Sequence, residues 1–177
     1  MPFSYSPRRV LLHWLSAVIL LWTLVSGFYV AYGPVSGSVQ HSIGSFNVSL
    51  TTVFIPLFVW RACLFVRELR ALESMLAWTQ GLVLFVHAMI YLTIGVVLFT
   101  GVLMMQTAIS VFGLIQIPQP LGDPSLIEWA NRVHTLSCVM LSILVAMHIG
   151  AVIWHEVSGR RILRRMAFSK ASGADSP

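Results

Sequence analysis

Charged side chains are scarce in this chain, and long stretches contain none. Only 10% of the 177 residues are Asp, Glu, Lys or Arg, against roughly 25% in soluble domains. None occurs between Arg9 and Arg61, between Glu73 and Asp123, or between Arg132 and Glu156. A membrane-spanning helix needs about 20 apolar residues. The first two gaps therefore have room for two spans and a turn each and the third for one span, which excludes an ordinary soluble domain.

Cysteines are few, and several catalytic motifs are absent. The two cysteines, Cys63 and Cys138, are too few for a disulfide framework. There is no phosphate-binding glycine loop, no nucleophile–base constellation and no CxxC pair, so hydrolytic and nucleotide chemistry have no support. The net charge of +5 could indicate nucleic acid. However, the basic residues stand at the ends of apolar segments, where they orient a membrane protein, and we expect no nucleic-acid partner.

The apolar segments predict an all-α, integral membrane four-helix bundle that forms a single domain over residues 1–177. We expect spans at about 10–32, 43–66, 81–105 and 132–155, followed by a short basic tail over 156–177. Ten of the eleven basic residues fall on one side of this arrangement, and only Arg132 falls on the other. Because basic residues accumulate on the cytoplasmic side, both termini are predicted to be cytoplasmic.

Histidine is the residue type that indicates chemistry. Five histidines lie in or at the edge of apolar segments: His13, His87, His134, His148 and His155. A sixth, His41, stands just before the second apolar segment. An ionisable side chain within a membrane is costly and marks a functional site by default. For any one of them, a neutral imidazole that bonds to a neighbouring helix is the alternative. Five together suggest a common purpose.

The spacing within the last span suggests that purpose. His134 and His148 are 14 residues apart, so both side chains leave the same helix face, about 21 Å apart along the axis. His13 opens the first span at the depth of His148, and His41 lies on the side where His134 opens the fourth. Two cross-bundle pairs result, His13–His148 and His41–His134. Bis-histidine ligation holds a haem iron with no open position, which suits electron transfer. A structural zinc site is disfavoured, because its four ligands must converge on one point.

Other residues have candidate supporting roles beside ordinary ones. His87 and His155 could relay protons, or simply bond between helices. Arg132 could pair with a haem propionate. Met104 and Met105 could offer a thioether, although methionine in a span usually serves packing. Small residues either allow close helix approach or leave room for a porphyrin edge (Gly27, Gly95 and Gly101).

These residues resemble the bacterial cytochrome b561 family, which is related to the membrane cytochrome b subunits of hydrogenases and formate dehydrogenases. The resemblance covers nearly the whole chain. It rests on Tyr5-Ser6 with His13-Trp14, on His87 with Ile90-Tyr91, on residues 101–105, and on His134, His148 and His155. It implies four helices, two b haems, a multi-pass place in the bacterial inner membrane, and oxidoreductase chemistry with a quinone or quinol, which His87 and His155 could hydrogen-bond. Some members are similar to enzymes in which superoxide outside the membrane reduces quinone.

One position departs from the family pattern. The family's second-span ligand histidine usually stands fourteen residues before an arginine, and counting back from Arg61 gives Asn47, a poor haem ligand. His41 lies six residues earlier, about −120° away on an ideal helix. We expect His41 to be the ligand, with a kink at Pro56 helping it to reach. The alternatives are that the outer haem has one protein ligand, that it binds weakly, or that it is absent.

The expected function is therefore electron exchange between the quinone pool and a small or protein redox partner, such as a periplasmic donor. The alternative is a docking cytochrome b subunit of a larger membrane dehydrogenase complex, for which the outer loop over 106–131 offers little surface. A third possibility is a haem-free transporter with histidine proton relays, which the 14-residue spacing disfavours. The sequence does not indicate an oligomeric state.

Overall fold

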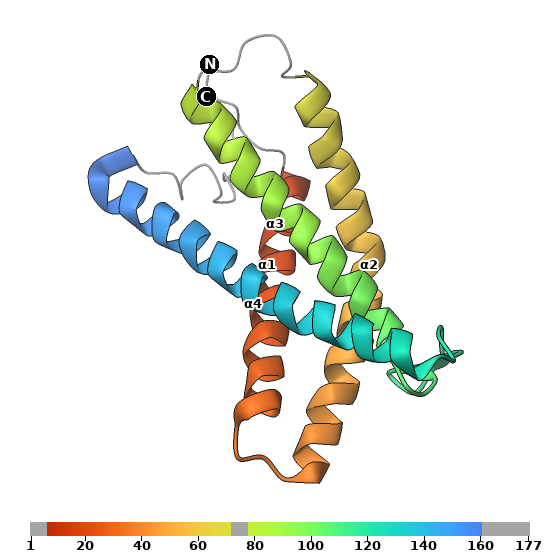
Figure 1. The fold of residues 1–177 in the computed structure, drawn as a ribbon. Helices are drawn as coiled ribbons and strands as arrows, with labels where there is room; N and C mark the ends of the chain where they lie inside the picture. Colours follow the sequence, from red (N-terminus) through yellow and green to blue (C-terminus); the bar gives the residue numbers. More distant parts are fainter. Residues whose placement is uncertain (1–6, 72–77, 161–177) are drawn as a thin grey trace, which may run out of the picture.

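Four long helices form the molecule in a computed structural model that describes residues 7–71 and 78–160 (Figure 1). They are α1 (Pro7–Tyr32), α2 (Gly37–Ala71), α3 (Trp78–Leu103) and α4 (Pro124–His155), and α4 continues into a short π-helical segment, η1 (Glu156–Arg160). All four are long and apolar enough to cross a membrane. The prediction of an all-α, four-helix membrane bundle is confirmed.

Because successive helices run in opposite directions, α1 begins and α4 ends at the same end of the bundle (Figure 1). The predicted cytoplasmic position of both termini requires this arrangement, but the side of the membrane stays a prediction. The basic tail expected over 156–177 includes residues 161–177, which lie outside the described part of the chain.

Helices α2 and α4 begin at least one turn before the predicted spans at 43 and 132. Helix α2 begins at Gly37 and runs through Pro56 without interruption. Helix α4 begins at Pro124, where the side chain of Asp123 accepts a hydrogen bond from the Ser125 N–H at 2.8 Å. An aspartate N-cap followed by proline is a common helix start. The span prediction missed these turns because it followed apolarity alone.

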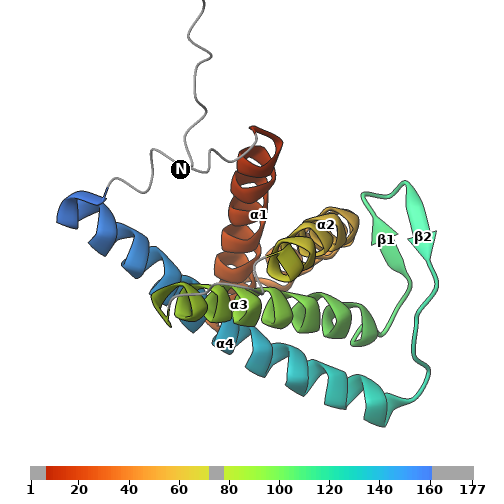
Figure 2. The ribbon, with the colours of Figure 1, turned by 90° about the horizontal axis from the view of Figure 1, so that it is seen from above.

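The helices pack as two pairs around a small core. Helix α1 packs mainly on α2 and helix α3 on α4 (Figure 2). The two pairs meet through a cluster of buried side chains from all four helices (Ile19, Phe54, Ile94, Leu98 and Leu141). Many other large apolar side chains are exposed on the outer surface of the bundle, as expected where lipid is the solvent.

The connection between α3 and α4 contains an antiparallel hairpin, β1 (Ile109–Val111) with β2 (Ile115–Ile117). Ser49 of α2 fastens it by donating to the Ser110 carbonyl and accepting from the Phe112 N–H, both at 3.0 Å. The hairpin therefore lies beside α2 (Figure 2), and this end of the bundle has a defined surface where the sequence predicted only a loop.

Candidate functional site

Three predicted histidines come together towards the end of the bundle where α1 begins. His13 of α1, His87 of α3 and His148 of α4 lie within electrostatic range of one another. The rings of His87 and His148 meet edge to face, with centroids 5.3 Å apart. All three side chains are partly buried. The structure thus brings together His13 and His148, one of the two pairs proposed from the sequence, at what we call the inner site.

Arg61 of α2 completes the inner site. Its Nη2 lies 2.9 Å from His13 Nδ1, and its Nε donates to the Tyr91 hydroxyl of α3 at 2.9 Å. The guanidinium also lies over the Tyr91 ring, 5.5 Å from its centre. All four helices therefore contribute a polar side chain to this level.

The Arg61–His13 contact has a chemical consequence. A guanidinium only donates hydrogen bonds, so His13 Nδ1 accepts here and its ring proton stands on Nε2. A histidine that ligates a metal through Nε2 has its proton on Nδ1 and needs an acceptor there. Ligation through Nε2 of His13 thus requires Arg61 to release the ring, which frees the guanidinium to pair with a carboxylate in bidentate fashion.

His155 and His87 have ring nitrogens without partners in the part of the chain that the structure describes. His155 follows His148 by seven residues on the same face of α4, and its Nδ1 is buried with no hydrogen-bond partner among the described residues. An orphaned buried polar atom is rare in proteins and marks a place for a missing partner. His87 Nδ1 lies 2.7 Å from the Val83 carbonyl, so its Nε2 keeps an available lone pair.

His134 occupies a second, outer level of the bundle. Its Nδ1 lies 3.0 Å from the Val97 carbonyl and 3.3 Å from the Thr100 hydroxyl of α3. Because a carbonyl only accepts, the proton is on Nδ1 and the lone pair is on Nε2. This is the tautomer that ligates a metal through Nε2. Cys138, one turn further along α4, places its Sγ 3.5 Å from that Nε2.

Gly101 makes room for the His134 ring. A Cβ at this position would stand 3.2 Å from His134 Cε1 and 3.4 Å from Nδ1, which is too close for comfortable packing. The sequence suggested two roles for the small residues, and at Gly101 the structure shows the close approach.

A cavity of about 320 Å³ lies between the two helix pairs, and His134 is one of its lining residues. Its lining is mostly aliphatic and comes from all four helices. Gly27 of α1 and Gly44 of α2 both line it, and a Cβ at either would meet no heavy atom within 4 Å. An apolar cradle with one ligand-ready imidazole fits a haem, since such sites combine apolar walls with a few placed polar groups.

Asn47 lines the same cavity from α2, but its side chain is already engaged. Its Oδ1 accepts from Trp22 Nε1 at 3.1 Å, and its Nδ2 donates to Ser26 Oγ at 2.9 Å. His41 is exposed near the start of α2 and is not among the residues that line the cavity. The structure therefore does not bring His41 to His134, and ligation by His41 stays a prediction.

Arg132 is placed away from the cavity. It is exposed and donates to Glu128, one turn earlier on α4, at 2.6 Å. With this partner in place, the pairing of Arg132 with a haem propionate stays a prediction.

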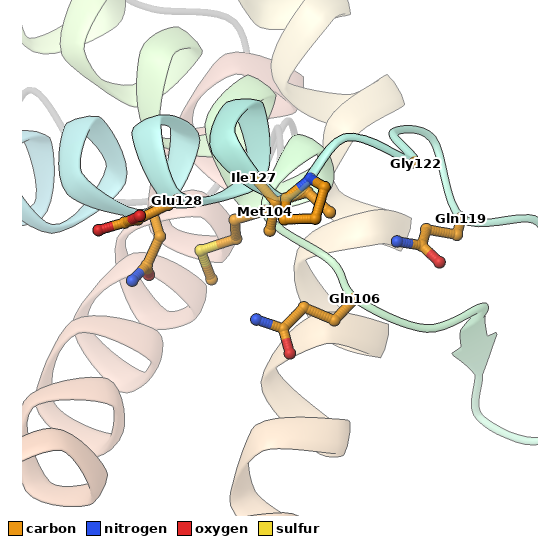
Figure 3. A pocket seen from close by; sticks show the side chains of 8 residues that line it. Met104, Gln106, Gln119, Gly122, Ile127 and Glu128 are labelled. Carbon is orange, nitrogen blue, oxygen red and sulfur yellow. The ribbon is translucent and has the colours of Figure 1, made fainter.

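A second pocket, of about 520 Å³, opens at the outer end of the bundle (Figure 3). Its lining includes the amides of Gln106, Gln119 and Asn131 and the side chains of Met104 and Glu128. Met104 lines both this pocket and the cavity beside His134, so the two spaces adjoin. Sequence reasoning missed the pocket, because its amides come from a loop and a helix start that show no periodic pattern.

Comparison with known families agrees with this picture. A family model described as prokaryotic cytochrome b561 matches residues 4–169, nearly the whole chain. None of the curated proteins compared with the chain matches it. The family match confirms the resemblance inferred from the histidine pattern.

Proposed function

We propose a quinone-linked electron-transfer function for this chain, because it belongs to the prokaryotic cytochrome b561 family. It is accordingly a multi-pass bacterial membrane protein, a b-type cytochrome that binds haem b and takes part in electron transfer. The finer proposal is that it lies in the inner membrane with both termini cytoplasmic. There it passes electrons between a quinone or quinol and a small or protein partner outside, such as a periplasmic donor or superoxide.

The convergence of His13, His148 and Arg61 is the observation that supports this proposal most. His13 and His148 come from helices at opposite ends of the sequence and reach one level, where they would hold a haem between two imidazoles. Arg61 would pair with a propionate once it leaves His13. When bound, the haem supplies reversible one-electron chemistry. The two imidazoles would orient it and would leave the iron no open position.

His87 and His155 are proposed to serve the quinone. Reduction of a quinone to a quinol takes up two electrons and two protons, so a proton donor must stand near each oxygen. Imidazole gives and takes protons near neutral pH. Within residues 7–71 and 78–160, the lone pair of His87 Nε2 is unengaged and the buried Nδ1 of His155 has no hydrogen-bond partner, which makes these two rings the candidates at this end of the bundle.

Spectra of the purified full chain test the proposal. We expect His148→Ala to remove the low-spin inner haem from the reduced-minus-oxidised spectrum and to abolish reduction by quinol. His155→Ala is the matched variant on the same helix face: it should keep the inner haem and slow quinol-driven reduction, with a changed pH profile. A full low-spin spectrum in His148→Ala would contradict the pairing of His13 with His148.

The exposed apolar residues of the hairpin favour a second candidate, a docking cytochrome b subunit of a larger dehydrogenase complex. Leu114 is 86% exposed and Ile115 is 60% exposed, while Ser49 holds the hairpin against α2. An apolar projection of this kind suits contact with a protein partner or lipid. Co-purification of a peripheral subunit that is lost in Leu114→Asp would establish this role.

A further inference from the structure

We infer that the outer cavity holds a haem through one axial histidine, His134, and leaves the opposite coordination position open to a small external ligand. The inference rests on the proposed function, which supplies the haem as the cofactor. It departs from the His41–His134 pair that the sequence predicts. An open position would make the outer level chemically different from the closed inner one.

His134 is prepared for ligation before any cofactor binds. The Val97 carbonyl fixes its proton on Nδ1, and the Nε2 lone pair accepts only a weak hydrogen bond from the Cys138 thiol at 3.5 Å, which ligation would displace. The ring occupies the space that Gly101 leaves free on α3. A backbone carbonyl acceptor orients a ligating histidine and raises its basicity. Of the histidines, His134 is the one that lines the cavity.

The facing helix pair offers no second ligand of suitable chemistry. The cavity lining from α1 and α2 contains no histidine, cysteine or methionine. Its amide, Asn47, is already bonded to Trp22 and Ser26, and a neutral amide is a poor ligand for haem iron beside imidazole and thioether. Its phenol, Tyr32, is the last residue of α1 and is 74% exposed, so it stands at the margin of the cavity.

The remaining soft donors either stand on the wrong side or belong to the cavity rim. Cys138 is next to His134 on the same helix, 3.5 Å from its Nε2, so it cannot reach the opposite face. Met104 and Met105 line the cavity where α3 ends, and a thioether from either is the competing sixth ligand that the experiment must exclude.

A polar pocket adjoins the cavity at the outer end of the bundle. Gln106 and Gln119 (Figure 3) and Asn131 line this pocket, and Met104 lines both the pocket and the cavity beside His134. The three amides are neutral, and the Glu128 carboxylate in the same lining is paired with Arg132, so a small polar molecule would meet no unpaired charge there. The external ligand is therefore expected to be small, and to arrive from the outer end of the bundle.

Carbon monoxide is the probe, because it binds ferrous haem that has an open position and not haem closed by two imidazoles. In dithionite-reduced wild-type protein we expect about half of the haem to bind CO, and the oxidised protein to show a high-spin signal beside the low-spin one. His134→Ala should remove the CO-reactive half while leaving the inner low-spin haem in place.

Substitutions at Asn47 provide the sharpest comparison. Asn47→His places an imidazole on the cavity wall that faces His134, and should convert the outer haem to low spin and reduce CO binding at least tenfold. Asn47→Gln keeps an amide there and should stay CO-reactive. His41→Ala should leave both spectra unchanged.

Several results would overturn the inference. Two low-spin haems without CO binding would do so, and the variant that then creates CO reactivity would identify the sixth ligand as His41, Met104 or Met105. One low-spin haem per chain would mean that the cavity holds no haem. In each case the inner haem and its reduction by quinol would survive. Loss of those two properties would instead refute the proposed function.

Discussion

Replacing Gly101 by alanine perturbs the outer site without changing a ligand. The added methyl group would stand 3.2 Å from His134 Cε1 and 3.4 Å from Nδ1. The 3.4 Å distance is ordinary contact, but the 3.2 Å distance is a few tenths of an ångström too short, so the ring has to shift slightly away from α3. That movement lengthens the 3.0 Å contact between Nδ1 and the Val97 carbonyl, which is the contact that holds the tautomer.

The expected loss is moderate and has two sources. Forcing an extra methyl group into a packed site costs about 1–3 kcal/mol, and weakening one hydrogen bond costs about 0.5–1.5 kcal/mol. Loss of an outer-shell partner of a metal-bound histidine typically lowers metal affinity about 10–100-fold. We therefore expect the outer haem to bind about 10–100-fold more weakly in Gly101→Ala, with the inner haem unaffected.

Haem titration of the apoprotein, followed through the CO-reactive fraction, measures this affinity. Gly95→Ala is the matched control on the same helix, because a Cβ there would lie at an ordinary 3.8 Å from the Phe58 ring. It should bind haem like the wild type. Equal affinity in Gly101→Ala and wild type, or an equal loss in both variants, would show that His134 does not depend on this close approach.

Four further changes have defined outcomes. Arg61→Gln should lower the midpoint potential of the inner haem by up to about 60 mV, because a nearby cation favours the reduced form; redox titration with Arg61→Lys as control measures this. Glu68→Gln breaks the ion pair between Arg9 of α1 and Glu68 of α2, whose side chains are 39% and 40% exposed. The change should lower the free energy of unfolding by less than about 1 kcal/mol, and denaturant unfolding at high salt should show no loss. Ser26→Ala should destabilise the α1–α2 contact by roughly 0.6 kcal/mol in detergent unfolding, and an unchanged value would mean that its bonds contribute nothing. Hydrogen bonds from Ser125 lower the pKa of Asp123 below its ordinary 3.8. The ionised carboxylate therefore contributes its full stabilisation above pH 3.8, and this stabilisation is lost as the pH falls through the lower folded-state pKa. Thermal unfolding of Asp123→Asn, which keeps an N-cap side chain, should lack this acid dependence.

The helices and the inner site were predictable because they depend on distances along one chain. Uncharged gaps define spans, and the 14 residues between His134 and His148 define two depths. Once the helices alternate in direction, His13 must share the depth of His148, and the structure brings them together. Depth follows from sequence spacing because the helical rise is constant.

The outer site was not predictable to the same extent, because it depends on how helices rotate against each other. The rotation of α2 about its own axis decides the environments of Asn47 and His41. It turns Asn47 towards Trp22 and Ser26 of α1 and leaves His41 exposed. No periodicity in one segment fixes that rotation. The span prediction also began α2 at residue 43, so the polar first turns that include His41 were not recognised as helical.

The two levels differ in how their histidines are held, and this difference has a physical reason. At the outer level the acceptor for His134 Nδ1 is the Val97 carbonyl, a backbone group that cannot rotate away, so the ligating tautomer exists with or without a cofactor. At the inner level the partner of His13 is the Arg61 side chain, which stabilises the other tautomer. A bound haem could reverse this only by offering Arg61 a better partner, and its carboxylates are such a partner. The inner histidine pair is therefore expected to form together with its cofactor, whereas the outer ligand is in place beforehand.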